Sequence, residues 1–193
     1  SSGLNRPRFV HFHMARHRRD HRFMGPQKGG DGDFAKTSKS ASRLSDALRR
    51  KAIKRTYLAV VHGVFAKKQD VLEDFLVKDH RQNIVSVAKP NHPKAKKAIL
   101  RYNVLEEKDG FSLLAVELQT GRPHQIRVQL SSRQHPLYGD QKYGQQVNKP
   151  GQQIALWSHT LTLEHPVKKE ELKLESLPPS KFPWNLWELT NRN

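Results

Sequence analysis

The spacing of apolar residues changes along the chain and predicts a succession of β-strands with two helices between them. The first helical pattern begins near Ser38, where Leu44, Ala47, Leu48 and Ile53 recur at spacings of three to five. Basic residues surround these apolar positions. The sequence therefore predicts an amphipathic, basic helix ahead of the first long strand.

Runs rich in β-forming residues follow this helix. They comprise TYLAVVHG from Thr56 to Gly63, an irregular pair of strands in 71–88, Ala98–Leu105, Phe111–Leu118, Ala155–Leu163 and Glu171–Leu177. The EEKDG segment between the third and fourth of these runs contains Asp-Gly, which is a hairpin signal. The apolar alternation of Leu113 and Ala115 fits a strand lying against a core. The pattern predicts an α+β fold with a mostly antiparallel sheet.

A second helix is predicted within TGRPHQIRVQL, directly after the strand that ends at Leu118. We expect Thr120 to cap this helix and Pro123 to lie in its first turn, where proline is tolerated. Ile126 and Leu130 then face inward. Arg127 projects from a different side of the helix.

The charge of the chain changes which partners are expected. Its 193 residues suit one compact domain, and 35 Lys and Arg against 18 Asp and Glu give a net charge of +17. Such a surface attracts polyanions, and binding to them depends steeply on salt. No run approaches the roughly 18 apolar residues of a membrane span, so nucleic acid is favoured over a membrane. The absence of cysteine excludes disulfides, thiolate chemistry and cysteine-based zinc sites.

The amino-acid composition changes near residue 34. This change predicts a basic arm over 1–33 and a folded domain over 34–193. The arm holds five glycines and an excess of basic residues with no sustained period, so it is expected to be extended or weakly ordered. It is either a solvated tail or a segment that orders on RNA. In the second alternative, four arginines of the arm contact RNA: Arg16, Arg18, Arg19 and Arg22. An Arg-rich start also suits a transit peptide, so the expected compartment is intracellular, in the cytoplasm or an organelle such as the mitochondrion.

The arm also contains His11, His13, His17 and His21, which include side chains spaced i, i+4. The surrounding arginines would repel a cation, so we expect no metal site there. The chain has no Walker loop, dinucleotide fingerprint or Ser-His-Asp arrangement.

Four segments in the same order resemble the RluA family of RNA pseudouridine synthases. TGRPHQIRVQL followed by HPLYGDQKYG resembles the family's TGR-x-HQIR-x-HL…HP-x-x-GD-x-x-YG signature, and it is the most specific signal in the chain. KRTYLAVVHG resembles the K-x-Y-x-A segment, FAKTSKSASRL the stretch before it, and IALWSHTLTLEHPV a late strand of the family. The resemblance runs from Phe34 to about Pro183.

The resemblance implies a mixed, mainly antiparallel sheet with a central RNA-binding cleft. It implies isomerisation of a uridine in rRNA or tRNA to pseudouridine, with no metal or cofactor. Tyr57 matches the tyrosine that packs against the target base, and Arg127 matches the arginine that pairs with the catalytic aspartate. An aromatic face recovers stacking energy for a base that leaves its helix, and a guanidinium can hold a carboxylate ionised.

Further RNA contacts are expected beside these two catalytic candidates. Arg122 and His124 lie at the start of the second helix, where backbone N–H groups favour phosphate. Lys54 and Arg55 precede Tyr57 in the KRTYLAVVHG segment. Gly139 and the other glycines of the signature are expected to be turn residues, and Asp140 and Tyr143 to hold the loop after the helix.

The chain departs from the family pattern at the catalytic aspartate, which belongs to an HRLD-x-x-TSG motif. The expected spacing points to Gly25, within HRFMGPQKGGDGDFAK, and no Asp follows the HR there. The available carboxylates, Asp20, Asp31 and Asp33, lack the motif, and the opening strands with K-P-x-G are absent. Either the domain has lost catalysis, or a second chain supplies the missing half, or residues 1–33 replace the true segment.

Two functions therefore stay open. One is an active RNA uridine isomerase that uses Tyr57, Arg127 and an aspartate outside the recognisable motif. The other is a catalytically silent synthase domain that serves as a structural component of a ribosomal particle or as an assembly factor. The missing aspartate favours the second function. The presence of both Tyr57 and Arg127 favours the first.

Overall fold

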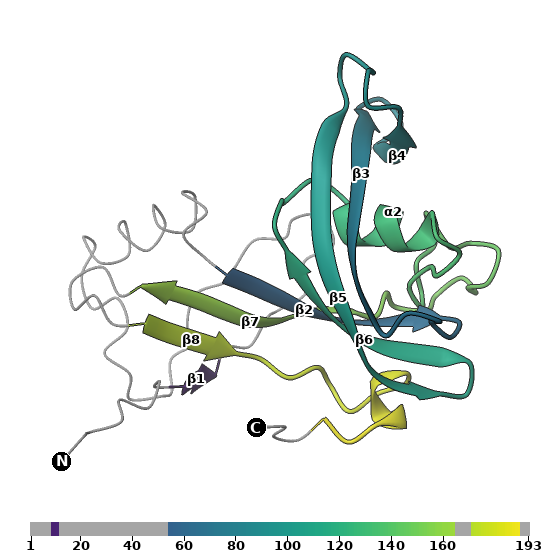
Figure 1. Ribbon diagram of the computed structural model, residues 1–193. Coiled ribbons are helices and arrows are strands. Elements are labelled where there is room, and N and C mark those ends of the chain that lie inside the picture. Colours follow the sequence, from purple (N-terminus) through teal and green to yellow (C-terminus); the bar gives the residue numbers. More distant parts are fainter. Residues whose placement is uncertain (1–8, 12–53, 165–170, 190–193) are drawn as a thin grey trace. The chain divides into compact units, whose positions relative to one another are not determined.

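The computed structural model describes residues 9–11, 54–164 and 171–189. The chain divides into two compact units, one of residues 1–55 with 158–177 and the other of residues 56–157 with 178–193. Figure 1 shows the elements of both units. The basic helix expected from Ser38 lies outside the described residues, as do the arm's arginines.

The larger unit is built on an antiparallel sheet in which the strands lie in the order β2, β6, β5, β3, β4 (Figure 1). Their bounds are Lys54–His62 for β2, Phe111–Leu118 for β6, Lys96–Lys108 for β5, Gln69–Asp79 for β3 and Ile84–Ala88 for β4. All the predicted strands of this region are present. The α+β class and the mainly antiparallel sheet are confirmed.

The hairpin between β5 and β6 turns at Asp109 and Gly110, as the Asp-Gly signal predicts. Both residues have positive φ, 53° and 79°, which a two-residue turn of this kind requires. β5 continues beyond the expected end at Leu105 as far as Lys108, because a register shift between Val104 and Glu106 lets the pairing with β6 resume.

Both faces of the central strands are buried, so β6 lies between two cores. Leu114 and Val116 pack on one face with the helix residue Ile126, whereas Leu113 packs on the other face with Trp184. β6 was expected to bury one face only, whereas side chains on both of its faces are buried. The second core is closed by the short 3-10 helix η1, Trp184–Leu186.

The predicted second helix is present but shorter, as α2, Gln125–Ser131. Ile126 and Leu130 are buried, as expected. The expected cap is wrong: His124, with φ of 53°, precedes the helix and no side chain caps it. The Thr120 hydroxyl is instead used by the sheet, since it accepts the N–H of Ile99 at 2.8 Å and donates to the side-chain carbonyl of Gln125 at 2.8 Å.

The described part of the smaller unit includes β1, β8 and most of β7. β7, Leu156–Glu164, pairs antiparallel with β8, Glu171–Glu175, so the two closing strands are confirmed. β1, Phe9–His11, pairs parallel with β8. Three residues of the predicted arm thus belong to a sheet. Among the described residues, no helix is long and apolar enough to cross a membrane.

Candidate functional site

The segment after α2 is fixed to the sheet by backbone hydrogen bonds. Leu137 forms an isolated bridge with Val61, and the N–H of Tyr138 donates to the carbonyl of Val60 at 2.9 Å. Gly139 follows with φ of 77°, and a Cβ there would overlap the backbone carbonyl of Gln153. Glycine is therefore required at position 139 both for its φ and for this close approach.

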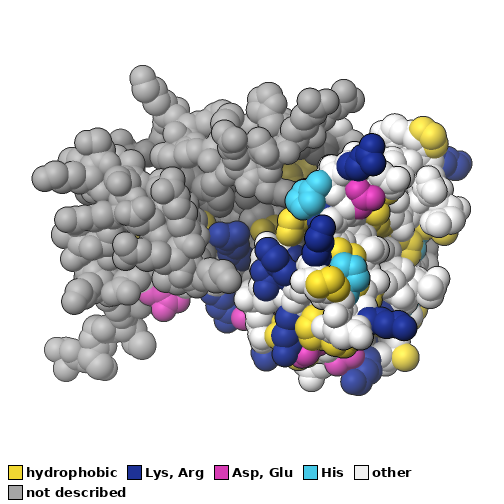
Figure 2. All heavy atoms as spheres, turned by 90° about the horizontal axis from the view of Figure 1, so that it is seen from above, with side chains coloured by type: hydrophobic (Ala, Val, Ile, Leu, Met, Phe, Trp, Pro, Cys, Tyr) yellow, Lys and Arg dark blue, Asp and Glu magenta, His cyan; other side chains and the backbone are white. Residues whose placement is uncertain are grey.

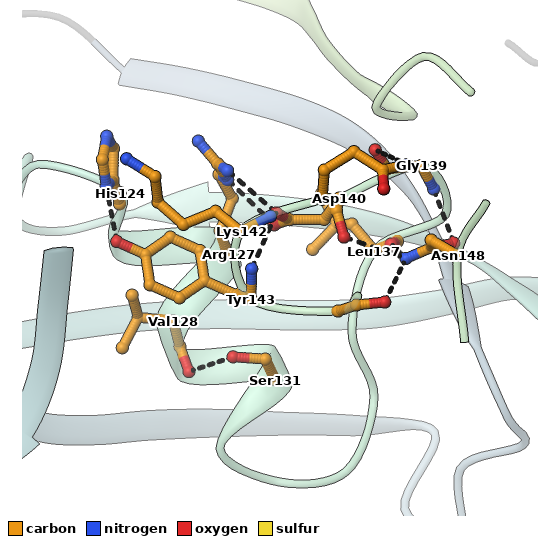
Figure 3. Close-up of polar contacts among 12 residues, drawn as sticks. His124, Arg127, Val128, Ser131, Leu137, Gly139, Asp140, Lys142, Tyr143 and Asn148 are labelled. Carbon is orange, nitrogen blue, oxygen red and sulfur yellow. Dashed lines mark hydrogen bonds and ion pairs between the residues drawn. The ribbon is translucent and has the colours of Figure 1, made fainter. Parts of the chain in front are cut away.

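Asn148 ties the loop together from inside (Figure 3). Its amide N–H groups donate to the carbonyls of Leu137 at 2.9 Å, Asp140 at 3.2 Å and Gly144 at 2.9 Å. Its side-chain oxygen accepts the N–H of Gly139 at 2.8 Å. The side chain is buried, so these bonds form away from water and give the loop one conformation.

The fixed loop places Asp140 against Arg127 of α2 (Figure 3). The guanidinium donates from Nε to Oδ2 at 2.9 Å and from Nη2 to Oδ1 at 2.8 Å, which is a bidentate pair. The Arg127 side chain is 20% exposed, whereas that of Asp140 is 0% exposed. Of the two side chains, only that of Arg127 therefore reaches solvent.

The Asp140 carboxylate accepts four hydrogen bonds, of which three go to Oδ1. Besides Arg127, its Oδ1 accepts the backbone N–H groups of Lys142 and Tyr143, each at 3.0 Å. Burial alone would raise the pKa of this carboxyl. The hydrogen bonds and positive charge of Arg127, together with the two backbone donors, outweigh burial and hold the pKa below its ordinary value. Asp140 is thus ionised near neutral pH and anchors Arg127.

Tyr143 lies under the same guanidinium and connects it to strand β4. The Arg127 guanidinium carbon is 5.0 Å from the centre of the Tyr143 ring, within range of a cation–π contact. The Tyr143 hydroxyl accepts the N–H of Val85 at 2.9 Å and lies 2.6 Å from Nδ1 of His124. Burial raises the pKa of the Tyr143 phenol, so the hydroxyl stays protonated near neutral pH.

Tyr57 points to the same face of the sheet as α2. It pairs with Val116 across β2 and β6, and directly paired residues share a face. Tyr57 packs against the core cluster that contains Val116 and Ile126. The side chain is half-buried, and thus one part of the ring contacts core and another part meets solvent.

The other expected RNA contacts are only partly placed. Arg122 donates from Nε to the carbonyl of Lys97 at 2.9 Å, so its guanidinium is oriented by β5. Lys54 and Arg55 are the first two residues of β2, exposed and half-buried respectively. Arg16, Arg18, Arg19 and Arg22 lie outside the described residues.

The phosphate site expected at the start of α2 stays a prediction. The N–H of Arg122 donates to the side-chain oxygen of Gln125 at 2.9 Å, and the N–H of Gln125 donates to the carbonyl of Arg122 at 3.2 Å. These two donors are therefore occupied within the chain. Within the described ranges, no three His, Asp or Glu side chains gather as metal ligands would.

Two residues that hold the site in place, Asn148 and Asp74, were not predicted from the sequence. Asn148 belongs to QQVNKPGQQ, whose composition indicates only a loop. Asp74 of β3 accepts hydrogen bonds from Gln129 at 2.9 Å and Arg133 at 2.7 Å, which fixes α2 to the sheet. Both roles depend on contacts between segments far apart in the chain, so local patterns do not reveal them.

Comparison with known proteins gives a consistent result. The pattern of the family described as RNA pseudouridylate synthase matches residues 34–132. A ribosomal large subunit pseudouridine synthase D of Haemophilus ducreyi is 31% identical over 161 residues, which cover 77% of this chain and 48% of that protein. An uncharacterized RNA pseudouridine synthase, YjbO, of Bacillus subtilis is 36% identical over 138 residues, covering 72% of this chain and 47% of that protein. The chain thus spans about half the length of these relatives.

Solved structures share the fold. Human RNA Pseudouridylate Synthase Domain Containing 1 matches with a TM-score of 0.63 at 20% identity, over 77% of this chain and 63% of that one. Human RNA Pseudouridylate Synthase Domain Containing 4 matches with a TM-score of 0.61 at 22% identity, over 78% and 67%.

Proposed function

Because the chain belongs to the RNA pseudouridylate synthase family, we propose that it binds RNA and isomerises a uridine to pseudouridine, with Arg127 and Tyr57 at the reacting base. The observation that carries this proposal is the fixed guanidinium of Arg127. A surface arginine would be mobile, whereas this one is held by a bidentate pair with Asp140 and by the ring of Tyr143. Such preorganisation is what a site for a charged reaction requires.

The proposed roles follow from what each side chain exposes. The isomerisation breaks the bond from C1′ to N1 and forms one from C1′ to C5, after which the hydrogen on C5 leaves as a proton. The Arg127 side chain is 20% exposed, so a second carboxylate can approach it from solvent and be held ionised. Tyr57 offers a half-buried ring to the extruded base, which offsets part of the cost of unstacking.

Asp140 is unsuited to the role of nucleophile. Its side chain is 0% exposed, and it already accepts hydrogen bonds from Arg127, Lys142 and Tyr143. An active enzyme therefore needs another carboxylate at the surface edge of Arg127. In this proposal it comes from residues outside the described ranges, such as Asp20, Asp31 or Asp33, or from a second chain.

Ribosomal RNA is the favoured substrate, because a relative at 31% identity is named for the large ribosomal subunit. Transfer RNA remains the second substrate to test. The net charge of +17 suits either polyanion.

A silent RNA-binding domain is the second candidate function. It is favoured by one observation: in the described part of the chain, the carboxylate bound to Arg127 is the buried Asp140. In that case the domain serves as a structural component of a ribosomal particle or as an assembly factor.

Tritium release decides between the two functions. RNA labelled at C5 of uridine, as ribosomal and as transfer RNA, is incubated with the full chain, and released tritium is counted while RNA affinity is measured separately. An active synthase releases tritium, and Tyr57→Phe or Arg127→Lys abolishes the release without abolishing binding. Lys108→Gln, a change at an exposed residue at the end of β5, is the matched control and should leave both unchanged.

The silent domain gives a different pattern. It binds both RNAs tightly, releases no tritium, and shows the same affinity with Tyr57→Phe. Absence of RNA binding in the unmodified chain contradicts both functions.

A further inference from the structure

A basic recess opens beside α2 within the larger unit. It has a volume of about 670 Å³, which is within the range of ligand pockets. Its apolar lining comes from β3, β4 and Pro123. Its rim is cationic, and the members of this cationic rim are Lys78, Arg81, Lys94, Lys96 and Arg122.

The five cations of the rim outnumber the one described acidic residue of the lining. Among the described residues, none of the five cations is in an ion pair. The one acidic residue of the lining, Asp79, is used by the β3–β4 turn, where it accepts the N–H groups of Arg81 at 3.0 Å and Gln82 at 3.2 Å. Clustered cations repel one another, so a bound anion would stabilise the rim.

Strand register explains why these cations gather. Lys96 pairs with Leu76, and Leu76 packs on the face that α2 covers with Val128. Lys78 follows Leu76 by two residues and therefore points to the same face. Lys97 points to the other face and is paired with Glu73 at 3.1 Å. Lys78 and Lys96 thus lie on the face of the sheet that α2 covers.

The recess adjoins the site through shared residues. Val85 lines it and donates its N–H to the hydroxyl of Tyr143, whose ring contacts Arg127. Pro123 lines it and is followed by His124, which contacts the same hydroxyl. Figure 2 shows one face of the molecule, on which the described part displays Lys and Arg side chains with fewer acidic ones.

We propose that this recess holds phosphate groups of the RNA strand next to the target uridine, with the cationic rim as their counter-charge. The inference rests on the proposed RNA binding and adds a second anchoring point to it. Phosphate contacts position a nucleic acid without reading its sequence. The recess therefore sets affinity and register, while Arg127 and Tyr57 act on the base.

The test compares two triple variants of the full chain with equal loss of charge. The recess variant carries Lys78→Gln, Lys94→Gln and Lys96→Gln. The control variant carries Lys108→Gln, Lys149→Gln and Lys181→Gln, and these three control lysines are exposed and lie outside the recess lining. The affinity for a ribosomal RNA fragment is measured from about 50 to 300 mM salt. The recess variant should bind on the order of tenfold more weakly, with a salt slope smaller by about 2. A recess variant with Lys78→Arg, Lys94→Arg and Lys96→Arg should retain the affinity.

Several outcomes overturn the inference. Equal affinity loss in the two triple variants means a general charge effect. No loss in the recess variant, with tight binding by the unmodified chain, means that the recess serves another partner, such as an acidic protein segment. Failure of the unmodified chain to bind RNA is a failure of the proposed function itself, and the unmodified chain is therefore measured first.

Discussion

Arg127 and Asp140 form a bidentate ion pair in which the aspartate side chain is completely buried and the arginine side chain is not. Thirteen positions separate them, and the pair joins α2 to the loop that follows it. The arginine that the sequence relates to catalysis is thus anchored by an aspartate of the GD segment. This anchor, rather than a reactive carboxylate, is the role that the contacts of Asp140 support.

Removal of the Asp140 carboxylate should destabilise the fold. Asp140→Ala leaves the Arg127 charge and two backbone N–H groups without their acceptor, which costs on the order of 3 kcal/mol of unfolding free energy. Urea unfolding of the full chain measures this cost. Asp109→Asn is the control, since Asp109 is exposed in a left-handed turn conformation that Asn tolerates. Equal stability of Asp140→Ala and the control would contradict the anchoring role.

The Asp140 ion pair should make stability depend on pH in the acid range. Its folded-state pKa lies below the unfolded value of about 3.9, so the unfolded chain takes up this proton first as pH falls. The stabilisation is complete above about pH 5 and is lost as pH falls through the folded-state pKa. The difference in unfolding free energy between the unmodified chain and Asp140→Asn should therefore shrink from pH 6 to pH 3. A difference that stays constant with pH would show that the carboxyl has the same pKa in the folded and in the unfolded chain.

Two glycines with similar φ should respond differently to alanine. Gly139 and Gly151 have φ of 77° and 87°, so alanine is strained at either position by roughly 1 kcal/mol. At Gly139 the new Cβ would also overlap the carbonyl of Gln153, whereas nothing lies within 4 Å of a Cβ at Gly151. Gly139→Ala should therefore lower the melting temperature much more than Gly151→Ala. Equal shifts would mean that the loop adjusts freely.

The Tyr143 hydroxyl should matter more than that of Tyr138. Tyr143→Phe keeps the ring under Arg127 but leaves the N–H of Val85 without its acceptor, which costs about 1–3 kcal/mol. Among the described residues no partner is found for the Tyr138 hydroxyl, so Tyr138→Phe should be nearly neutral. Thermal unfolding of both variants measures the contrast. A similar small effect in both would show that the Val85 N–H is satisfied by water.

Local sequence patterns predicted most of the strands. TYLAVVHG, the Asp-Gly turn and the two closing runs each contain their own signal, because alternation and turn chemistry act over a few residues. The motif TGRPHQIRVQL likewise identified Arg127 through its resemblance to a family. The Thr120 cap was wrong, because the hydroxyl of Thr120 bonds to Ile99 of a neighbouring strand. Tertiary pairing there outweighed the local preference.

What the sequence by itself determined is the charge of the chain, the antiparallel strands and the identity of Arg127 and Tyr57 as candidates. What only the tertiary structure decided is the arrangement around them: Asp140 as the buried partner of Arg127, Asn148 as the support of the loop, and the cationic rim beside α2. The physical reason is the distance along the chain over which each effect acts. Propensity and periodicity are properties of neighbouring residues, whereas an ion pair or a cluster of charges forms only when strand register and loop closure bring distant side chains together.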